Sequence, residues 1–286
     1  MIIDIHTHTF PEKIAEKALQ GLQAACHTEK FSDGTEKGLI NKMKTGGVDI
    51  SVILPVAKSH KQVEHVNDAS VQINEKHAGD GLISFGCMHP DYDNYKNELR
   101  RIKSYGIKGI KVHPPYQGYD LDDIKYLRIL YEAASLDLIV LTHAGLDIGL
   151  PGIVRCTPKM SAHAMKEVCG NGHSDFKFVL AHMGGWRNWD EVIKYLPGLG
   201  VYIDTAFYTG VMHPLPDGYW DGKDIRQMDQ NMFVKVCKAI GTDHVLFGTD
   251  SPWGDQKETI DFIKRTRLTE TEIKNILGEN AKKVLG

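Results

Sequence analysis

Two histidines, His6 and His8, have the spacing of a metal-binding pair. They end the run Ile-Ile-Asp-Ile-His-Thr-His over residues 2–8, whose apolar residues are typical of a β-strand. Successive side chains of a strand point to opposite faces, so these two project to the same side and can offer two imidazoles to one cation. Imidazole suits Zn, Fe, Ni or Cu, and a catalytic zinc site with three protein ligands leaves a position open for water. The pair therefore predicts half of a metal site.

Other ligand-type side chains follow other apolar runs of the chain. Lys111 and His113 lie in Gly-Ile-Lys-Val-His-Pro, His143 in Thr-His-Ala-Gly, His182 in Ala-His-Met-Gly-Gly, and Asp250 in Gly-Thr-Asp-Ser-Pro. Five of the 14 histidines thus lie at or just beyond the end of an apolar run. In a closed barrel the carboxyl ends of the strands surround one rim, so these side chains are expected to converge there.

The elements that must position these residues are short strands alternating with amphipathic helices. The expected strands are residues 2–5, 50–54, 82–87, 109–112, 138–141, 176–181, 201–204 and 245–248. The expected helices are residues 63–77, 95–105, 124–134, 162–169, 189–196 and 228–240. This alternation indicates repeated βα units and a parallel sheet. Eight strands in 286 residues fit one α/β domain over residues 1–286, a (β/α)8 TIM barrel.

Three long connections, residues 10–37, 144–158 and 205–225, follow the carboxyl ends of expected strands. Barrel enzymes place their active sites at that end, and such lengths are uncommon unless the loop is functional. Late in the chain, Thr269 and Glu272 have the spacing of a helix capping box. Residues 280–285 are expected to form one more short helix in the outer ring.

The order of these motifs resembles a known family. The pair His6 and His8, followed by His143, His182 and Asp250 in the contexts given above, is similar to the metal-dependent amidohydrolase superfamily. More narrowly, the chain resembles the amidohydrolase 2 branch. That branch holds hydrolases of small acids and lactones, and decarboxylases of the aminocarboxymuconate semialdehyde and resorcylate type.

The resemblance implies a role for each matching residue. His6, His8, His143 and Asp250 would bind one divalent metal ion, with zinc the expected ion. Asp250 could bind the ion directly or accept a hydrogen bond from its water, and the family pattern allows both. His182 would be the base that orients or deprotonates that water, because a bound cation brings the pKa of water from about 15.7 toward 7. An imidazole, with an ordinary pKa of about 6.5, can then accept or return the proton.

The fourth expected strand leaves a second metal ion open. Superfamily members with two metals often bridge them with a carbamylated lysine on this strand, and Lys111 lies there. In the branch favoured here one ion suffices, so Lys111 is interpreted as a buried or rim cation. His113, two residues later and before two prolines, is expected to contact substrate or support the strand end.

Traces of substrate recognition are few. Arg155 and Arg187 follow the expected fifth and sixth strands, and Trp253 follows the eighth. The arginines could hold a carboxylate and the indole a planar apolar body. Each of them is, taken alone, more often a surface or loop-anchoring residue.

Composition limits the classes of partner. The chain is 42% hydrophobic and 25% charged, with a net charge of -3 and a pI near 6.5. These values are typical of a globular protein and argue against nucleic acid as a partner. No signal peptide or membrane span is evident, and five scattered cysteines without a CxxC spacing are expected to be reduced thiols. We therefore expect a cytoplasmic protein with a small-molecule substrate, and a homodimer is allowed.

Three functions follow from this pattern. The leading hypothesis is a hydrolase that adds a metal-activated water to an amide, lactone or ester of a small carboxylic acid. The alternative is nonoxidative decarboxylation of a small aromatic or muconate-like acid at the same metal. A barrel whose metal is structural, or which binds without turnover, is disfavoured because structural sites are usually closed by four protein ligands.

Overall fold

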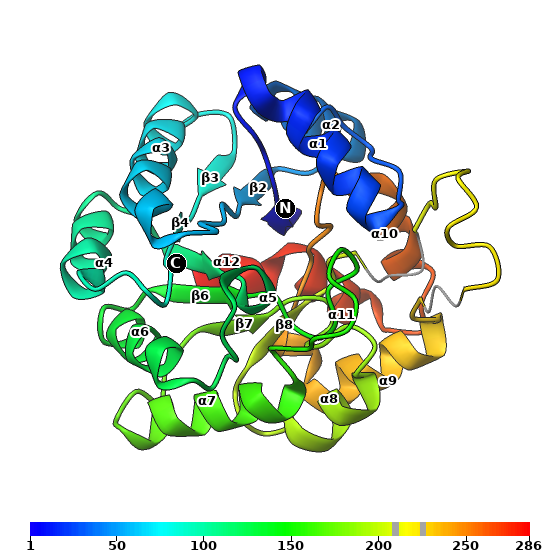
Figure 1. The fold of residues 1–286 in the computed structure, drawn as a ribbon. Helices are drawn as coiled ribbons and strands as arrows, with labels where there is room; N and C mark the ends of the chain where they lie inside the picture. Colours follow the sequence, from blue (N-terminus) through cyan, green and yellow to red (C-terminus); the bar gives the residue numbers. More distant parts are fainter. Residues whose placement is uncertain (208–211, 224–226) are drawn as a thin grey trace.

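The computed structural model describes residues 1–207, 212–223 and 227–286. Its strands are β1 (Ile3–Thr7), β2 (Ile50–Ile53), β3 (Leu82–Ser84), β4 (Gly86–Cys87), β5 (Gly109–Val112), β6 (Ile139–Thr142), β7 (Phe178–Leu180), β8 (Tyr202–Asp204) and β9 (Val245–Leu246). All pair in parallel, in the orders β1-β2-β3 and β4 to β9. The strands lie at the centre of the molecule with helices around them (Figure 1).

The two groups of strands form one closed ring. β3 and β4 are separated by Phe85 alone, so they are two parts of one bent strand that joins the groups. At the other edge, the Ile5 N–H donates to Phe247 O at 2.9 Å, and the Asp250 N–H donates to His6 O at 2.8 Å. These bonds connect β1 to the chain after β9. The eight expected strands are therefore present, and the TIM barrel is confirmed.

The helices cover the outside of the ring. They are α1 (Glu12–Cys26), α2 (Glu36–Gly46), α3 (Val63–Lys76), α4 (Tyr95–Ser104), α5 (Pro114–Gln117), α6 (Ile124–Ser135), α7 (Pro158–Gly170), α8 (Trp189–Tyr195), α9 (Gln230–Ile240), α10 (Gln256–Lys264), α11 (Glu270–Lys274) and α12 (Asn280–Leu285). Short turns of other helix types are η1 (His60–Gln62), η2 (Thr242–His244) and η3 (Asn275–Glu279). The expected capping box is confirmed, since Thr269 and Glu272 cap α11 reciprocally. None of the helices in the described ranges is both long and apolar enough to cross a membrane.

Several segments differ from the expectation: α2, α5 and α10 were not among the expected helices, and α1 and α12 differ as well. The connection 10–37 contains α1, which buries only Ala15, Leu19 and Cys26 and has no side-chain cap at its start. The final helix α12 does not lie in the outer ring, because Ala281, Val284 and other residues of α12 pack with the residues that fill the barrel. The connection 205–225 is described only in part, since residues 208–211 and 224–225 lie outside the described ranges.

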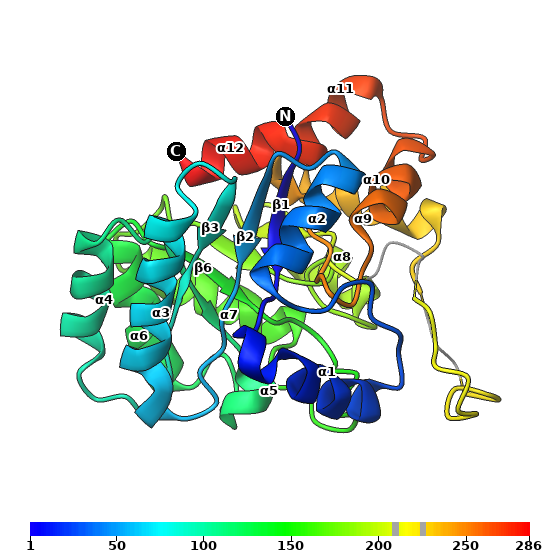
Figure 2. The ribbon, with the colours of Figure 1, turned by 90° about the horizontal axis from the view of Figure 1, so that it is seen from above.

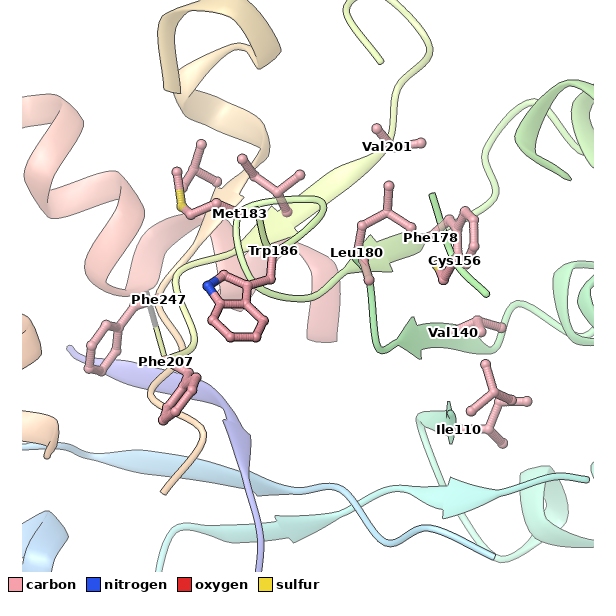
Figure 3. Close-up of a cluster of buried hydrophobic side chains, with 14 of the residues drawn as sticks. Ile110, Val140, Cys156, Phe178, Leu180, Met183, Trp186, Val201, Phe207 and Phe247 are labelled. Atoms are coloured by element: carbon pink, nitrogen blue, oxygen red, sulfur yellow. The ribbon is translucent and has the colours of Figure 1, made fainter. Parts of the chain in front are cut away.

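The core has two parts. Inside the ring, alternate strand residues such as Val52, Leu141 and Leu246 pack together and meet α12. Seen from above, α11 and α12 lie at one end of the barrel, while α1 and α5 lie at the other (Figure 2). A larger cluster fills the space between strands and outer helices. Figure 3 shows the part of it around Phe178 and Trp186. Because α12 closes the barrel at the amino-terminal ends of the strands, a site is expected at their carboxyl-terminal ends.

Candidate metal centre

A cavity of about 200 Å³ lies at the carboxyl end of the strands. Its wall includes the ligand-type residues His6, His8, Lys111, His113, His143, Asp147, His182 and Asp250. The rest of the wall is mainly apolar and aromatic, and α1 contributes to it with Leu22, Ala25 and Cys26. Side chains from the first, fourth, fifth, sixth and eighth strands of the ring thus meet at one rim, as the sequence indicated.

An irregularity in β1 turns its first histidine into the barrel mouth. Ile3 and Ile5 already point into the barrel core, so strict alternation would place His6 on the outside. The pairing of β1 with β2 shifts register between Asp4 and Thr7, which is the mark of a β-bulge. Bulges re-aim side chains at barrel rims. Here the shift lets His6 line the cavity, although it follows Ile5 directly.

Three side-chain atoms form a triangle, two from histidines near the start of the chain and one from an aspartate near its end. His6 Nε2 lies 3.2 Å from His8 Nε2. Asp250 Oδ1 lies 3.4 Å from His6 Nε2 and 2.9 Å from His8 Nε2. Two ligands bound to one ion by bonds of about 2.0–2.2 Å are separated by about 3–3.5 Å. The three edges therefore match one face of a metal coordination shell, and we call His6, His8 and Asp250 the metal triangle.

The hydrogen bonds of the Nδ1 atoms of His6 and His8 determine which atoms of these rings carry lone pairs at the triangle. His8 Nδ1 donates to Leu54 O at 2.8 Å, because a carbonyl can only accept. His6 Nδ1 lies 2.7 Å from Asp204 Oδ2. The other oxygen of Asp204 accepts from the backbone N–H groups of His182 and Ala206, which holds the carboxylate as an acceptor. In neutral imidazoles, both Nε2 atoms then carry lone pairs. Carboxylate–histidine–metal and carbonyl–histidine–metal arrangements of this kind are usual around bound ions.

Facing lone pairs make the triangle a fit for a cation. Two imidazole nitrogens and a carboxylate oxygen at 2.9–3.4 Å repel one another unless a positive charge lies between or beside them. Lys111 Nζ, 3.3 Å from His6 Nε2, supplies part of that charge. Two histidines and one carboxylate on one face suit a divalent ion such as Zn²⁺, Mn²⁺ or Fe²⁺ with open positions.

A buried network holds the Asp250 loop against β1. The Asp4 carboxylate accepts from the Thr249 hydroxyl at 2.6 Å, from the Thr249 N–H at 3.1 Å and from Gln256 Nε2 at 2.8 Å. Asp4 is fully buried, and burial raises its pKa to about 7. These bonds fix the residue before Asp250, so they keep its carboxylate in register with His6.

The structure places His143 beside the triangle rather than in it. His143 Nδ1 lies 3.1 Å from His182 Nε2, and His143 falls into a second group of close ligand atoms with His113 and Asp147. The loops that carry His143 and His182 pack against each other at Gly145, where an added Cβ atom would lie 2.0 Å from the backbone nitrogen of Trp186. Only glycine allows that approach. The role of His143 as a ligand of the first ion stays a prediction.

His182 has the surroundings of a proton-transfer group. Its Nδ1 donates to Ala206 O at 3.1 Å, and its ring centre lies 5.4 Å from that of His6. Burial lowers the pKa of His182 to about 4 and that of His143 to about 3, so both are neutral at pH 7. Burial also lowers the pKa of Lys111 to about 8. Lys111 is 1% exposed, and its carbamylation as a bridge between two ions stays the less favoured alternative.

The predicted substrate contacts divide into two pairs. His113 and Trp253 line the cavity. Arg155 and Arg187 do not. The Arg155 guanidinium is held 3.0 Å from Asp120, and that of Arg187 stacks 5.0 Å from the centre of the Trp186 ring. These contacts account for the absence of both arginines from the cavity wall.

Other lining residues were missed from the sequence. Lys58 follows β2, and its Nζ lies 4.6 Å from the centre of the Tyr116 ring. Tyr116 in turn stacks on His113, with ring centres 4.0 Å apart. Asp147 lies four residues beyond His143. The signal that could have found Lys58 and Asp147 is the one used for the histidines, a polar residue in the connection that follows a barrel strand.

The metal-free protein is expected to lose stability as the pH falls from 6.5 toward 4. His143 and His182 bind protons near pH 6.5 when unfolded but only near pH 3 and 4 when folded, so the unfolded state binds more protons in that window. Each should lower the free energy of unfolding by about 2 kcal/mol at pH 5. Burial lowers the pKa of His6 and His113 as well, which adds to the loss, and it raises the pKa of Asp4, Asp147 and Asp204, which opposes it. Four histidines therefore act against three carboxyl groups. Urea unfolding of chelator-treated protein at pH 7.5 and pH 5 measures this, and an equal or higher midpoint at pH 5 would contradict it.

Comparison with known families gives a match across the chain. The sequence profile of the amidohydrolase family matches residues 3–286. No curated protein sequence matches this chain.

Solved structures of similar fold cover nearly all of the chain. One is 5-carboxyvanillate decarboxylase from Sphingomonas paucimobilis, with a TM-score of 0.68 and 13% identity over 99% of this chain and 98% of that one. A dihydroxybenzoic acid decarboxylase from a Polaromonas species, with bound manganese and the inhibitor 2-nitroresorcinol, has a TM-score of 0.65 and 14% identity over 99% and 96%. A probable 2-pyrone-4,6-dicarboxylic acid hydrolase from Acinetobacter baumannii, with citric acid bound, has a TM-score of 0.64 and 18% identity over 100% and 99%.

Proposed function

Since the chain belongs to the amidohydrolase family of metal-dependent enzymes, we propose that it removes the carboxyl group of a small aromatic or muconate-like acid without oxidation. The observation that carries this proposal is the position of the metal triangle in a cavity with aromatic walls. Phe10, Tyr116, Trp186, Phe207 and Trp253 all line it. An apolar cavity of about 150 Å³ takes benzene in another protein, so about 200 Å³ suits one ring with its substituents.

The solved structures of similar fold support the same choice. Two of the three described above are decarboxylases of hydroxylated aromatic acids, and one holds manganese. The sequence pattern had favoured hydrolysis, with decarboxylation as the alternative. The aromatic wall and these likenesses together favour the alternative. The ion of the metal triangle is proposed to be Mn²⁺ or Zn²⁺, and residues 1–286 are taken as one catalytic domain because residues from both ends of the chain form the triangle.

The reaction assigns a task to each side chain. Bound at the triangle, a divalent ion would supply positive charge for a carboxylate or neighbouring hydroxyl oxygen of the substrate. The bond from the ring carbon to the carboxyl group breaks, its electron pair stays on that carbon, and a proton replaces the released carbon dioxide. We assign the transfer of that proton to His182, which lies beside the triangle: its Nε2, the lone-pair atom of the neutral ring, would accept the proton of a substrate hydroxyl group and return it to the ring carbon. Trp253 and the other aromatic residues hold the ring and exclude water.

Lys58 is proposed to bind an anionic group of the substrate at the cavity mouth. Lys58 and Lys111 are the lysines of the cavity wall, and Lys58 is the exposed one. Replacing Lys58→Met is expected to raise KM about tenfold with little change in kcat, because a charge-assisted hydrogen bond is worth about 1.5 kcal/mol or more. Lys194→Met is the matched control, since Lys194 makes a similar contact with Tyr195 at 4.9 Å outside the cavity. Equal KM values for Lys58→Met and wild type would remove Lys58 from the substrate site.

The reaction is tested by carbon dioxide release. Protein loaded with Mn²⁺ or Zn²⁺ is incubated with hydroxybenzoic, carboxyvanillic and muconate-like acids under nitrogen, and gas and products are measured. The expected product has one carboxyl group fewer, and chelator-treated protein should give none. Turnover that requires oxygen, or no turnover of any acid by fully metal-loaded protein, would count against decarboxylation.

Hydrolysis is the second candidate, favoured by one feature of the site. The three residues of the metal triangle line the cavity with His182 beside them, which suits a water held for attack on a lactone or ester. One structure of similar fold is described as a probable hydrolase of a pyrone dicarboxylic acid. Ring opening of a lactone acid with no loss of carbon would support this candidate over decarboxylation.

A further inference from the structure

A buried carboxylate lies across the barrel mouth from the metal triangle. Asp147 belongs to the loop that follows β6, is 5% exposed and lines the cavity. With β3 and β4 counted as one strand, β6 lies opposite β1 in the ring of eight, and β5 lies opposite β9. The triangle comes from β1 and from the segment after β9. A substrate held at the triangle by one side therefore has its other side toward the loops that follow β5 and β6.

The Asp147 carboxylate is held in place but is incompletely paired. Its Oδ1 accepts from the Gly149 N–H at 2.8 Å. Its Oδ2 lies 3.5 Å from His113 Nε2, which is too long for a good hydrogen bond. In the described ranges of the chain, no lysine or arginine forms an ion pair with it. Burial raises the pKa of Asp147, because a charge with few hydrogen-bond donors is costly away from water. The carboxylate can therefore accept a further hydrogen bond from a ligand.

His113 orients this carboxylate. The His113 ring is stacked between Tyr116, with ring centres 4.0 Å apart, and His143, with ring centres 4.5 Å apart. Burial lowers the pKa of His113, so the ring is neutral at pH 7 and carries one N–H group. The proton belongs on Nε2, because a lone pair on that atom would face the lone pairs of Asp147 Oδ2. The stacked ring thus holds the carboxylate from one side, and His113 is a positioning residue for Asp147.

The surroundings of Asp147 restrict what can bind to it. Leu146 and Ile148, its neighbours in the chain, also line the cavity, and Tyr116 adds an aromatic ring. A substrate carboxylate would carry the same charge as Asp147, and an apolar group would leave the acceptor unpaired. A buried acceptor discriminates strongly against a ligand without the matching donor, because the acceptor then stays without a partner. This part of the wall therefore suits one donor group on an apolar ring.

We propose that Asp147, positioned by His113, accepts a hydrogen bond from a ring hydroxyl group on the side of the substrate away from the metal triangle. The inference rests on the proposed function, since it takes a small ring acid as the substrate. It narrows the substrate class to acids that carry a hydroxyl group meta or para to the reacting carboxyl group. Asp147 would then determine specificity among such acids, while the triangle and His182 carry the reaction.

The competing interpretation is that Asp147 only supports its loop through the hydrogen bond with Gly149. The two interpretations differ in how the binding of related acids changes when Asp147 is replaced. A displaced loop weakens the binding of every acid, with or without the hydroxyl group. Loss of a hydroxyl acceptor weakens only the binding of acids that carry that group. The measured quantity is therefore the ratio of two affinities.

The experiment uses the full chain loaded with Zn²⁺ and measures dissociation constants, or kcat/KM for any acid that is turned over. The acids are 2-hydroxybenzoic acid, its 4-hydroxy and 5-hydroxy derivatives, and the matching methoxy derivatives, which keep the oxygen but lack the donor. Wild type is expected to favour the better hydroxy derivative over the parent acid about tenfold, because a hydrogen bond to a charged group is worth about that factor. Asp147→Ala should reduce this ratio to about one. The methoxy derivatives should bind no better than the parent acid to either protein.

Asp120→Ala is the matched control. The Asp120 carboxylate is half exposed and pairs with Arg155 at 3.0 Å outside the cavity wall, so this variant should keep the wild-type ratio. Circular dichroism checks that each variant folds. If Asp147→Ala does not fold, Asp147→Asn replaces it, since the amide keeps an oxygen for the Gly149 N–H. The ratio should then fall to about threefold or less, because a neutral acceptor forms a weaker hydrogen bond than a charged one.

Three results would overturn the proposal. They are a wild type that binds neither hydroxy derivative better than the parent acid, a preference that is equal in wild type and Asp147→Ala, and no binding of any of these acids. The last result would count against the proposed function as well. Since binding ratios need no turnover, a preference that is lost in Asp147→Ala, in a protein that releases no carbon dioxide, would contradict the proposed reaction and still support the hydroxyl site. Carbon dioxide release without any hydroxyl preference would do the reverse.

Discussion

Asp250→Asn is expected to lose the ion of the metal triangle and at least about 10³-fold in kcat/KM. Asp250 Oδ1 touches both imidazole nitrogens of the triangle, at 2.9 and 3.4 Å, and it is the one carboxylate there. Changing a residue that only supports a ligand usually costs about 10–100-fold in metal affinity or activity, and loss of the charged ligand itself should cost more. A factor of 10³ corresponds to about 4 kcal/mol of transition-state stabilisation.

The choice of asparagine isolates the charge. Asp250 has a backbone φ of 61°, a conformation that asparagine adopts more readily than most residues. The fold should therefore survive, with an unfolding midpoint of metal-free protein near that of wild type. Asp93→Asn is the control, because the Asp93 side chain is 99% exposed and lies 4.0 Å from Arg128. Metal analysis and steady-state rates measure the effect, and an Asp250→Asn protein with full metal and wild-type rates would remove Asp250 from the triangle.

The barrel and the set of rim residues could be predicted because both depend on local patterns. Apolar runs of four to six residues and helical spacing between them identify βα repeats without knowledge of distant contacts. The rule that barrel strands carry functional residues at their carboxyl ends then placed His6, His143, His182 and Asp250 at one rim. The sequence did not predict the bulge in β1. The bulge does not separate the predicted pair, since the Nε2 atoms of His6 and His8 lie 3.2 Å apart.

What the sequence could not predict depends on side-chain partners far along the chain. Asp204 ends an expected strand, as the other rim residues do, but nothing local predicts that its carboxylate holds His6, which lies 198 residues away. The contact of Arg155 with Asp120, which draws an expected substrate residue out of the cavity, has no local signal either. The grouping of His143 with His113 and Asp147 depends on ring orientation, which a His-Ala-Gly motif does not encode. Sequence patterns find the rim, while long-range hydrogen bonds decide which rim residues act together.

His182→Asn is expected to lower kcat by about 10²–10⁴-fold while the metal stays bound, because a positioned proton-transfer group contributes about that factor. His182 lies outside the metal triangle, so its loss should not release the ion. Asparagine suits this position as well, since His182 has a φ of 59°. KM should change little if the side chain moves a proton rather than holding the substrate. The measurements are kcat, KM and metal content, together with the rate in added imidazole.

A proton-transfer role and a structural role for His182 predict different results. Free imidazole can enter the space left by the ring and restore part of kcat, whereas it cannot repair a displaced loop. His163→Asn is the matched control, because the His163 side chain is 52% exposed on α7, away from the cavity wall, and pairs with Asp122. If His182→Asn lost its metal together with its activity, the ring would be supporting the triangle instead. The proton that replaces the carboxyl group would then have to come from another group of the cavity, and the His143 ring would lose its hydrogen bond with His182.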